Sequence, residues 1–287
     1  MAHLKGSLRE LSLFTGAGGG ILGSSLLGFT TVCAVEYEPF PISTLACRQN
    51  EGLLPPFPIW DDVRTFNGLP WRGRAELVSG GFPCQDISVA GTGDGLDGSR
   101  SGLWREMSRI IGEVRPRFVF IENSLVLTSR GLDQVLADLA ALGYDAEWLR
   151  LSAAHVGANH IRYRLWILGA DTAGQGLQGY ASEIPKGRHQ SASVGQREQK
   201  DILHPSGLGH GSQDEVRAGR HLAELSGVER AIIDSPWWVV EPGLGRVAHG
   251  VANRVDRIKA VGNGQVPHVA FAAWNILYYR MFGQHFL

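Results

Sequence analysis

The N-terminal half of the chain alternates short apolar runs with segments whose apolar residues recur at helical spacing. The run LRELSLF (Leu8–Phe14) leads into the glycine turn TGAGGG, and ILGSSLLGF after that turn has the spacing of a helix. A second apolar run, TTVCAVE, ends at Glu36, and the segment after it reads as a helix with Pro39 in its first turn. This pattern predicts two successive strand–turn–helix units.

Three further apolar runs, AELVSGG, PRFVFIEN and YRLWILG, continue the alternation to about residue 169. Each is nearly all apolar, which is typical of parallel strands covered by helices on both faces. The segment LDQVLADLAALG, which closes at Gly143, is the clearest helix between them. The pattern predicts an α/β fold with a doubly wound, mostly parallel, Rossmann-like sheet.

The periodicity is lost after Gly169. From Asp171 to about Arg230 Gly, Ser, Gln and His dominate, which predicts a small irregular insert. Order returns with DSPWWVVEPG and NRVDRIKAVGNGQVP, and the last segment, HVAFAAWNILYYRMF, reads as a helix that docks on the sheet. We therefore expect a core of residues 1–169, an insert of residues 170–240 and a C-terminal segment of residues 241–287 that returns to the core.

Composition limits the partners of the chain. Its 287 residues contain 27 Lys and Arg against 28 Asp and Glu, so the net charge of −1 gives no global attraction to nucleic acid or membrane, and a basic face has to be local. The three cysteines form no CxxC pair, which argues against a metal site or a disulfide framework. The sequence shows no signal peptide and no apolar run of spanning length. These features favour a cytoplasmic protein without a membrane partner.

The glycine turn FTGAGGG is the first candidate for ligand binding. Such a turn lets a ligand approach the backbone at a helix N-terminus, and Glu36 ends the next strand where ribose hydroxyls would lie. Gly16, Gly18 and Gly20 do not match the third spacing of the dinucleotide fingerprint, so a nucleoside without a pyrophosphate is at least as good a candidate. A tight turn with a purely structural role is the alternative.

Cys84 lies in GGFPCQ, at the carboxyl end of a predicted strand, where open α/β sheets bind ligands. It would face the same crevice as the glycine turn and could act there as a thiolate nucleophile. The alternative is a small buried side chain, which is how we interpret Cys33 and Cys47 in their apolar surroundings.

Glu122 and Asn123 end another strand at the same edge, and a carboxyl group there could protonate or hydrogen-bond a ring nitrogen. Arg162 and Arg164 in HIRYRLW are two residues apart, so they share one face of a strand and could hold a phosphate or a carbonyl. The alternatives are that Glu122 is a loop or helix-capping carboxylate and that the two arginines lie on the surface of an edge strand.

Together these motifs resemble the DNA (cytosine-5-)-methyltransferases of bacteria and phages, in family order over nearly the whole chain. The resemblance rests on FTGAGGG, Glu36, WDDV, GGFPCQ, ENS, RYR and GNGQVP. It implies that Cys84 attacks C6 of a flipped-out cytosine in duplex DNA and that Glu122 engages N3 and the exocyclic amine. Arg164 would contact the base carbonyl, and Arg162 would support the catalytic loop and the phosphates.

The resemblance also implies S-adenosylmethionine as the methyl donor and S-adenosylhomocysteine as the product. The implied cofactor residues are Phe14, Gly16, Ala17, Gly18, Glu36, Tyr37, Asp62, Val63, Pro83, Leu103 and Asn263. Gln85, Ser88 and Asn123 are implied in DNA contacts or in positioning the nucleophile loop, and Gln85–Arg100 has the composition of a lid. Residues 170–240 would carry target recognition.

Two departures from the family pattern bear on these expectations. His160 stands where glutamine is common, and the insert is short and nearly neutral, so we expect a shallow salt dependence of DNA binding. Three alternatives stay open: a tRNA cytosine-C5 methyltransferase, a silent DNA-binding relative, and a thymidylate-synthase-like enzyme on free nucleotides. We expect a monomer, with a cognate restriction endonuclease as a possible partner. The recognised DNA sequence is left open.

Overall fold

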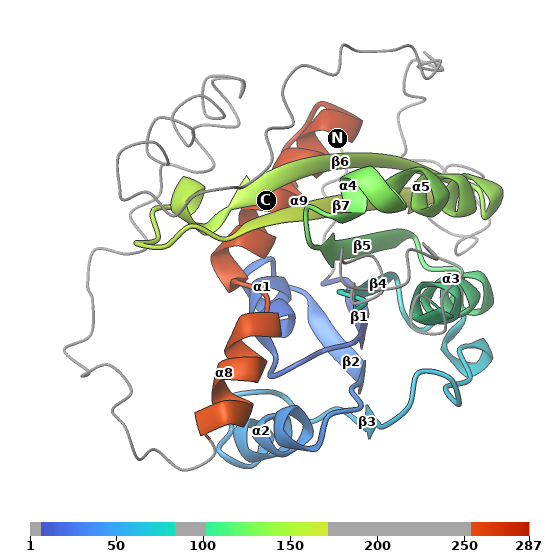
Figure 1. The fold of residues 1–287 in the computed structure, drawn as a ribbon. Helices are drawn as coiled ribbons and strands as arrows, with labels where there is room; N and C mark the ends of the chain where they lie inside the picture. Colours follow the sequence, from blue (N-terminus) through green and yellow to red (C-terminus); the bar gives the residue numbers. More distant parts are fainter. Residues whose placement is uncertain (1–6, 84–101, 172–253, 287) are drawn as a thin grey trace.

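A seven-stranded sheet forms the centre of the computed structural model, which describes residues 7–83, 102–171 and 254–286 (Figure 1). The strands run in the order β3-β2-β1-β4-β5-β7-β6. Their bounds are β1 (Arg9–Leu13), β2 (Thr30–Val35), β3 (Ile59–Trp60), β4 (Leu77–Gly80), β5 (Phe118–Asn123), β6 (Tyr144–Ser152) and β7 (Tyr163–Asp171). The helices are α1 (Gly19–Leu26), α2 (Pro39–Asn50), α3 (Gly102–Val114), α4 (Leu127–Arg130), α5 (Leu132–Ala141), α8 (Arg254–Asn263) and α9 (Pro267–Phe282), with short 3-10 turns at Leu69–Trp71 and Ala153–Val156.

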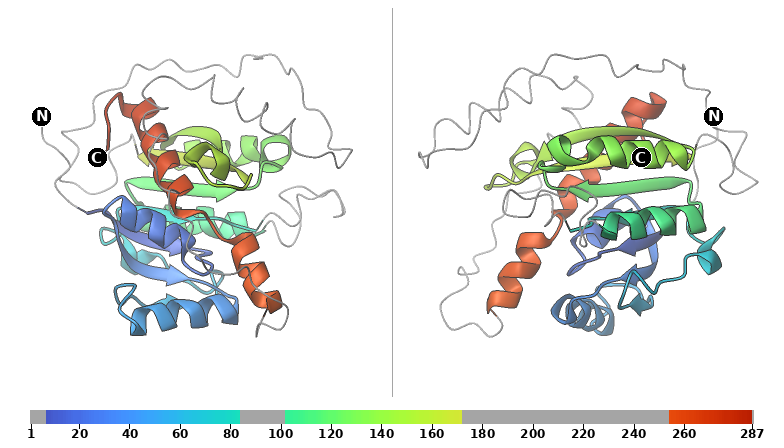
Figure 2. Two further views of the ribbon diagram at one scale, coloured as in Figure 1. Left: turned by 90° about the vertical axis from the view of Figure 1, so that its left-hand side faces the viewer. Right: turned by 45° about the vertical axis from the view of Figure 1, so that its right-hand side comes forward.

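The first five strands in chain order pair in parallel, β3 to β2, β2 to β1, β1 to β4 and β4 to β5. Helices cover both faces, α3 and α5 on one side and α1 and α9 on the other (Figures 1 and 2). The predicted doubly wound, mostly parallel α/β fold is confirmed. The predicted helix after the second strand is α2, with Pro39 at its first position. Proline is tolerated there because the N–H that it lacks would have no acceptor within the helix.

The last two strands differ from the expectation. The run YRLWILG forms β7, which is antiparallel to both β5 and β6, and β6 itself was not predicted. The connection from β6 to β7 holds only the turn Ala153–Val156 and a few further residues, too little for the crossover helix that a parallel pair needs. Along β6 exposed Asp145 and Arg150 interrupt the apolar positions, as suits a strand at the edge of the sheet.

Successive residues of each strand enter different cores. Leu11 and Leu13 of β1 pack on the side of α3 and α5, while Phe118 and Phe120 of β5 contact Trp274 of α9 on the other side. Every one of these side chains is buried. The core is therefore two-sided, as the all-apolar strands predict.

The C-terminal helix α9 lies along the sheet and packs against α1 (Figure 2). The two helices approach closely at Gly23, where a Cβ atom would lie 2.7 Å from the Cβ of Ala270. This contact holds the turn between α8 and α9 next to the glycine turn after β1. The predicted boundaries at residues 170 and 240 stay predictions, since residues 172–253 lie outside the described part.

No helix within residues 7–83, 102–171 and 254–286 is both long and apolar enough to cross a membrane.

Candidate active site

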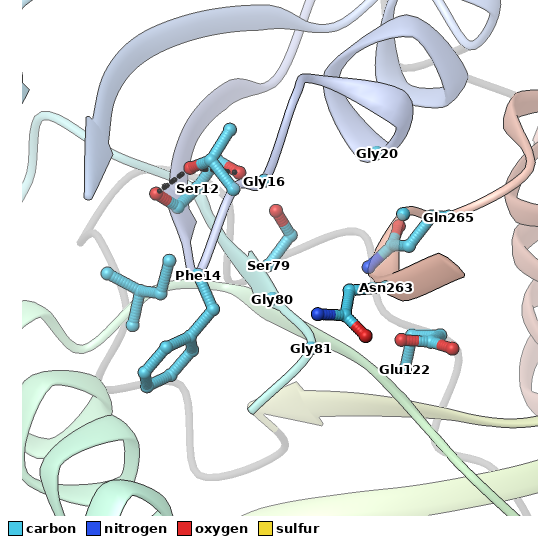
Figure 3. A pocket seen from close by; sticks show the side chains of 13 residues that line it. Ser12, Phe14, Gly16, Gly20, Ser79, Gly80, Gly81, Glu122, Asn263 and Gln265 are labelled. Carbon is cyan, nitrogen blue, oxygen red and sulfur yellow. Dashed lines mark hydrogen bonds between the residues drawn. The ribbon is translucent and has the colours of Figure 1, made fainter. Parts of the chain in front are cut away.

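The carboxyl ends of β1, β4 and β5 meet at one edge of the sheet. Leu13 is aligned with Gly80, and Gly80 with Ile121, so the residues that follow them lie side by side. A hollow opens at this edge (Figure 3). Its lining includes Phe14 and Gly16 after β1, Gly81 after β4, Glu122 at the end of β5, and Asn263 and Gln265 from the C-terminal segment.

Gly80 is required here by its close approach to the backbone of β1, and Gly81 lies against the carboxylate of Glu122. A Cβ atom at Gly80 would lie 2.5 Å from the carbonyl oxygen of Leu13, and one at Gly81 would lie 2.7 Å from Oε2 of Glu122. The backbone oxygen of Leu13 has no room to shift, whereas a side chain at Gly81 would have to displace the carboxylate of Glu122. The glycine pair of GGFPCQ therefore lets β4 end against β1 and against the catalytic candidate Glu122.

Glu122 is a buried carboxyl group with an ionic partner. Oε1 lies 2.9 Å from Nε of Arg164, which reaches it from the neighbouring strand β7. Burial raises the pKa of Glu122 to about 7, and the charges of Arg164 and Arg162 oppose that rise. Near neutral pH this carboxyl is therefore poised to hold or to release a proton.

Glu36, the residue predicted to bind the ribose, closes the glycine turn after β1. The N–H of Gly16 donates to Oε2 of Glu36 over 2.6 Å, and the N–H of Glu38 donates to Oε1 over 2.8 Å. Gly16 and Gly18 have φ of 59° and 91°, values that favour glycine. The carbonyl of Ala17 accepts a hydrogen bond from Nη1 of Arg48 over 2.8 Å, so α2 also holds the turn.

Arg162 binds the C-terminal turn in this structure. Its Nη2 donates to the carbonyl oxygens of Gly262 and Gly264, over 2.6 and 2.7 Å. Asn263, the predicted cofactor residue between these glycines, lines the hollow beside Glu122 (Figure 3). Arg164 thus pairs with Glu122, whereas Arg162 binds the turn between α8 and α9.

Asn123 contacts the segment that leads to the predicted nucleophile. Its Nδ2 donates to the carbonyl of Phe82 over 3.1 Å, two residues before Cys84. Pro83 is exposed at the end of this described range. Cys84, Gln85 and Ser88 lie outside the described residues, as does the whole of the predicted lid, Gln85–Arg100.

Eight of the eleven predicted cofactor residues do not line the hollow, Glu36 and Pro83 described above among them. Tyr37 is exposed, with the guanidinium of Arg64 over its ring, and Asp62 is paired with the same Arg64 at 2.8 Å. Val63 is buried in the core, and Leu103 packs against that core from the first turn of α3. Ala17 and Gly18 lie in the glycine turn itself.

Sequence reasoning did not select four lining residues that have polar side chains, Ser12, Thr15, Ser79 and Gln265, and Gln265 is the largest of them. It belongs to GNGQVP, from which only Asn263 was selected. The signal was present in the motif, but the glycine turn that receives Gln265 lies about 245 residues earlier in the chain, and nothing in the sequence pairs the two.

Among the described residues, no group of three or more His, Cys, Asp or Glu side chains is arranged to hold a metal ion.

Comparison with known proteins identifies the family of the chain. A family model described as C-5 cytosine-specific DNA methylase matches residues 8–224. This match covers well over half of the chain, and the chain belongs to this family.

Individual relatives match a shorter stretch. The type II methyltransferase M.CviJI of Paramecium bursaria Chlorella virus IL3A is 31% identical over 164 residues, covering 56% of this chain and 43% of its own length. M2.BsuMI of Bacillus subtilis (strain 168), also a type II methyltransferase, is 33% identical over 169 residues, covering 56% and 41%. The chain thus spans less than half the length of these two relatives. Among solved structures, the S. pombe Dnmt2 methyltransferase aligns with a TM-score of 0.47 and 21% identity over 57% of this chain and 50% of that one, which is too distant to carry an argument.

Proposed function

We propose that this protein transfers a methyl group from S-adenosylmethionine to C5 of cytosine in duplex DNA. The observation that carries the proposal is the buried Glu122, paired with Arg164 at 2.9 Å and facing a hollow walled by the glycine turn. A carboxyl group with a pKa of about 7 can give a hydrogen bond to a ring nitrogen at neutral pH, which an ordinary exposed glutamate cannot.

The chemistry requires such a group because C5 of cytosine is a poor nucleophile. Addition of the Cys84 thiolate to C6 would move electron density to C5, and Glu122 would stabilise the adduct at N3. Arg164 would hold the base carbonyl while keeping Glu122 in place. After C5 has taken the methyl group, a base removes the C5 proton and the thiolate leaves, which restores the ring.

The hollow and the residues next to it fit S-adenosylmethionine, which supplies an electrophilic methyl group. The first N–H groups of α1, at Gly19 and Gly20, have no acceptor within the helix and suit a carboxylate. Glu36 lies at the end of β2, and its carboxylate already accepts from the backbone of the glycine turn, so it stands where ribose hydroxyls can compete for it. Phe14 and Asn263 line the same hollow.

The substrate and setting follow from the same proposal. A cytosine in a duplex has to be flipped out before a thiol can reach C6, at a cost of a few kcal/mol. We assign contact with DNA to Gln85 and Ser88, positioning of the loop to Asn123, and target recognition to residues 170–240. The protein would act in the cytoplasm as a monomer, with a restriction endonuclease as a possible partner, and would need no metal.

Methyl transfer decides between DNA and tRNA directly. Purified protein is incubated with S-adenosylmethionine carrying a labelled methyl group and with either duplex DNA of mixed sequence or bulk tRNA, and the nucleosides are analysed by mass spectrometry. We expect labelled 5-methyl-2′-deoxycytidine from DNA and none from the Cys84→Ser variant. Label in tRNA alone would assign the protein to RNA, and full activity of Cys84→Ser would remove the assigned nucleophile.

A further inference from the structure

The wall of the hollow nearest Glu122 is supplied by a turn that comes from the far end of the chain. This turn consists of the last two residues of α8 and of residues 264–266, which connect α8 to α9. Its Asn263 and Gln265 line the hollow together with Glu122 (Figure 3). The position of this turn relative to β5 therefore sets the shape of the site.

Arg162 fixes the backbone of the turn. One nitrogen, Nη2, donates to the carbonyls of Gly262 and Gly264, the residues on either side of Asn263. Both bonds come from a charged guanidinium, and hydrogen bonds from a charged donor are about twice as strong as neutral ones. The two acceptors lie about 100 residues further along the chain. The contact thus joins the start of β7 to the C-terminal segment.

Gln265 occupies a slot made by glycines from two other elements. A Cβ atom at Gly19 would lie 2.2 Å from the backbone oxygen of Gln265, and one at Gly20 would lie 2.7 Å from its Oε1. On the opposite side, a Cβ atom at Gly81 would lie 3.5 Å from Nε2 of Gln265. The first turn of α1 and the end of β4 leave space that this side chain fills.

Arg164, two residues further along, has a different task. Its Nε bonds Glu122, on the side where a target base would be bound. The pair of arginines is therefore divided between the catalytic carboxyl and the turn that carries Asn263 and Gln265.

We propose that Arg162 and Gln265 form a latch that builds the cofactor side of the site, with Arg162 as a positioning residue for S-adenosylmethionine rather than a contact to DNA phosphates. The inference rests on the proposed function, since it names the ligand of the same hollow. Gln265 lines the space for the methionine end of that ligand, and Arg162 holds Gln265 and Asn263 in place through their backbone.

The test separates cofactor affinity from DNA affinity. Binding of S-adenosylhomocysteine to Arg162→Met, Gln265→Ala and wild-type protein is measured by calorimetry without DNA. Binding of a duplex is measured by fluorescence anisotropy at several salt concentrations. We expect Arg162→Met to lose about tenfold or more in S-adenosylhomocysteine affinity, with partial recovery in Arg162→Lys, and the salt slope of DNA binding to stay unchanged.

The matched control is Arg150→Met, which removes the same charge from an exposed position on the edge strand β6. It should leave S-adenosylhomocysteine affinity as in wild type. If Arg162→Met binds S-adenosylhomocysteine normally while its salt slope falls by about 0.9, Arg162 is a phosphate contact and the latch is wrong. Should Arg162→Met fail to fold, Gln265→Ala with unchanged S-adenosylhomocysteine affinity overturns the latch by itself. Wild-type protein that binds no S-adenosylhomocysteine overturns the proposed function as well, which distinguishes the two failures.

Discussion

Two buried glutamates lie near opposite ends of the parallel strands, one at the amino ends and one at the carboxyl ends. Glu10, near the start of β1, accepts hydrogen bonds from the hydroxyls of Ser24, Ser79 and Thr31, at 2.6, 2.6 and 2.8 Å. Glu122, near the end of β5, pairs with Arg164 and faces the hollow.

Both carboxyl groups have a pKa raised by burial, so a raised pKa does not separate a structural glutamate from a catalytic one. The hydrogen bonds of the three hydroxyls oppose the rise at Glu10, and two arginine charges oppose it at Glu122. Access differs as well, because Glu10 lies between α1 and the sheet while Glu122 lines a hollow. We therefore assign the reaction chemistry to Glu122, because a ligand can reach it and because the neighbouring arginine charges lower its pKa.

The largest expected difference between the two sites is in catalysis. Glu122→Gln keeps the shape of the side chain but removes its proton, so we expect the single-turnover rate of methyl transfer to fall at least about a hundredfold. Glu10→Gln, the matched control, should transfer methyl groups at the wild-type rate. Comparable rates in the two variants would contradict the division of roles.

Stability should show the opposite order. Glu10→Ala leaves three hydroxyls without their acceptor and opens a cavity, and we expect the free energy of unfolding to fall by about 4 kcal/mol. Urea denaturation measures the loss, with Glu10→Gln as the milder reference because its amide oxygen still accepts. An unfolding free energy of Glu10→Ala equal to that of wild type would show that the hydroxyls find other partners.

The difference in pH-dependent stability between wild type and Glu122→Gln isolates the titration of Glu122, because both proteins keep Glu10 with its raised pKa. The pKa of Glu122 is raised from 4.5 to about 7 on folding, so its contribution is fully present below pH 4.5 and is lost as the pH rises through 7. Relative to wild type, Glu122→Gln should therefore gain up to about 3 kcal/mol of unfolding free energy between pH 5 and pH 8. A constant difference over this range would mean that Glu122 titrates normally in the folded protein.

The smallest effect is expected for the ionic partner. Arg164→Lys keeps the charge but loses the planar fork that orients Glu122, and we expect kcat to fall about tenfold. Steady-state rates at saturating cofactor and DNA measure this change. A rate equal to that of Glu122→Gln would instead make Arg164 as important as the carboxyl itself.

The parts of the fold that follow from local pattern were predictable. A run of apolar residues, a cluster of glycines and a helical repeat predict β1, the glycine turn and α1 in that order. Leucines at helical spacing and the closing Gly143 predict α5. Strand direction is not written in that way, because β7 is as apolar as a parallel strand, and β6 carries polar residues on its exposed side. The direction follows from the short connection between them.

The candidate site was predictable where one motif supplies one side chain. Glu122 and the glycine turn belong to such motifs, and the structure brings them to one hollow. Glu10 was hidden because a single acid in an apolar run looks like an exposed position, and its three hydroxyls come from three other elements. The partners of Arg162 were hidden for a similar reason, since they are backbone carbonyls, which no sequence pattern marks.

Trapping the covalent adduct tests the central claim most directly. In duplex DNA with 5-fluorocytosine in place of cytosine, addition and methyl transfer can proceed, but fluorine cannot leave as a proton does, so the thiol stays attached. With S-adenosylmethionine present we predict a complex of protein and DNA that survives denaturation, with Cys84 as the modified residue by peptide mass spectrometry. Methylation of ordinary cytosine without any such complex, or an adduct on a residue other than Cys84, would contradict the account.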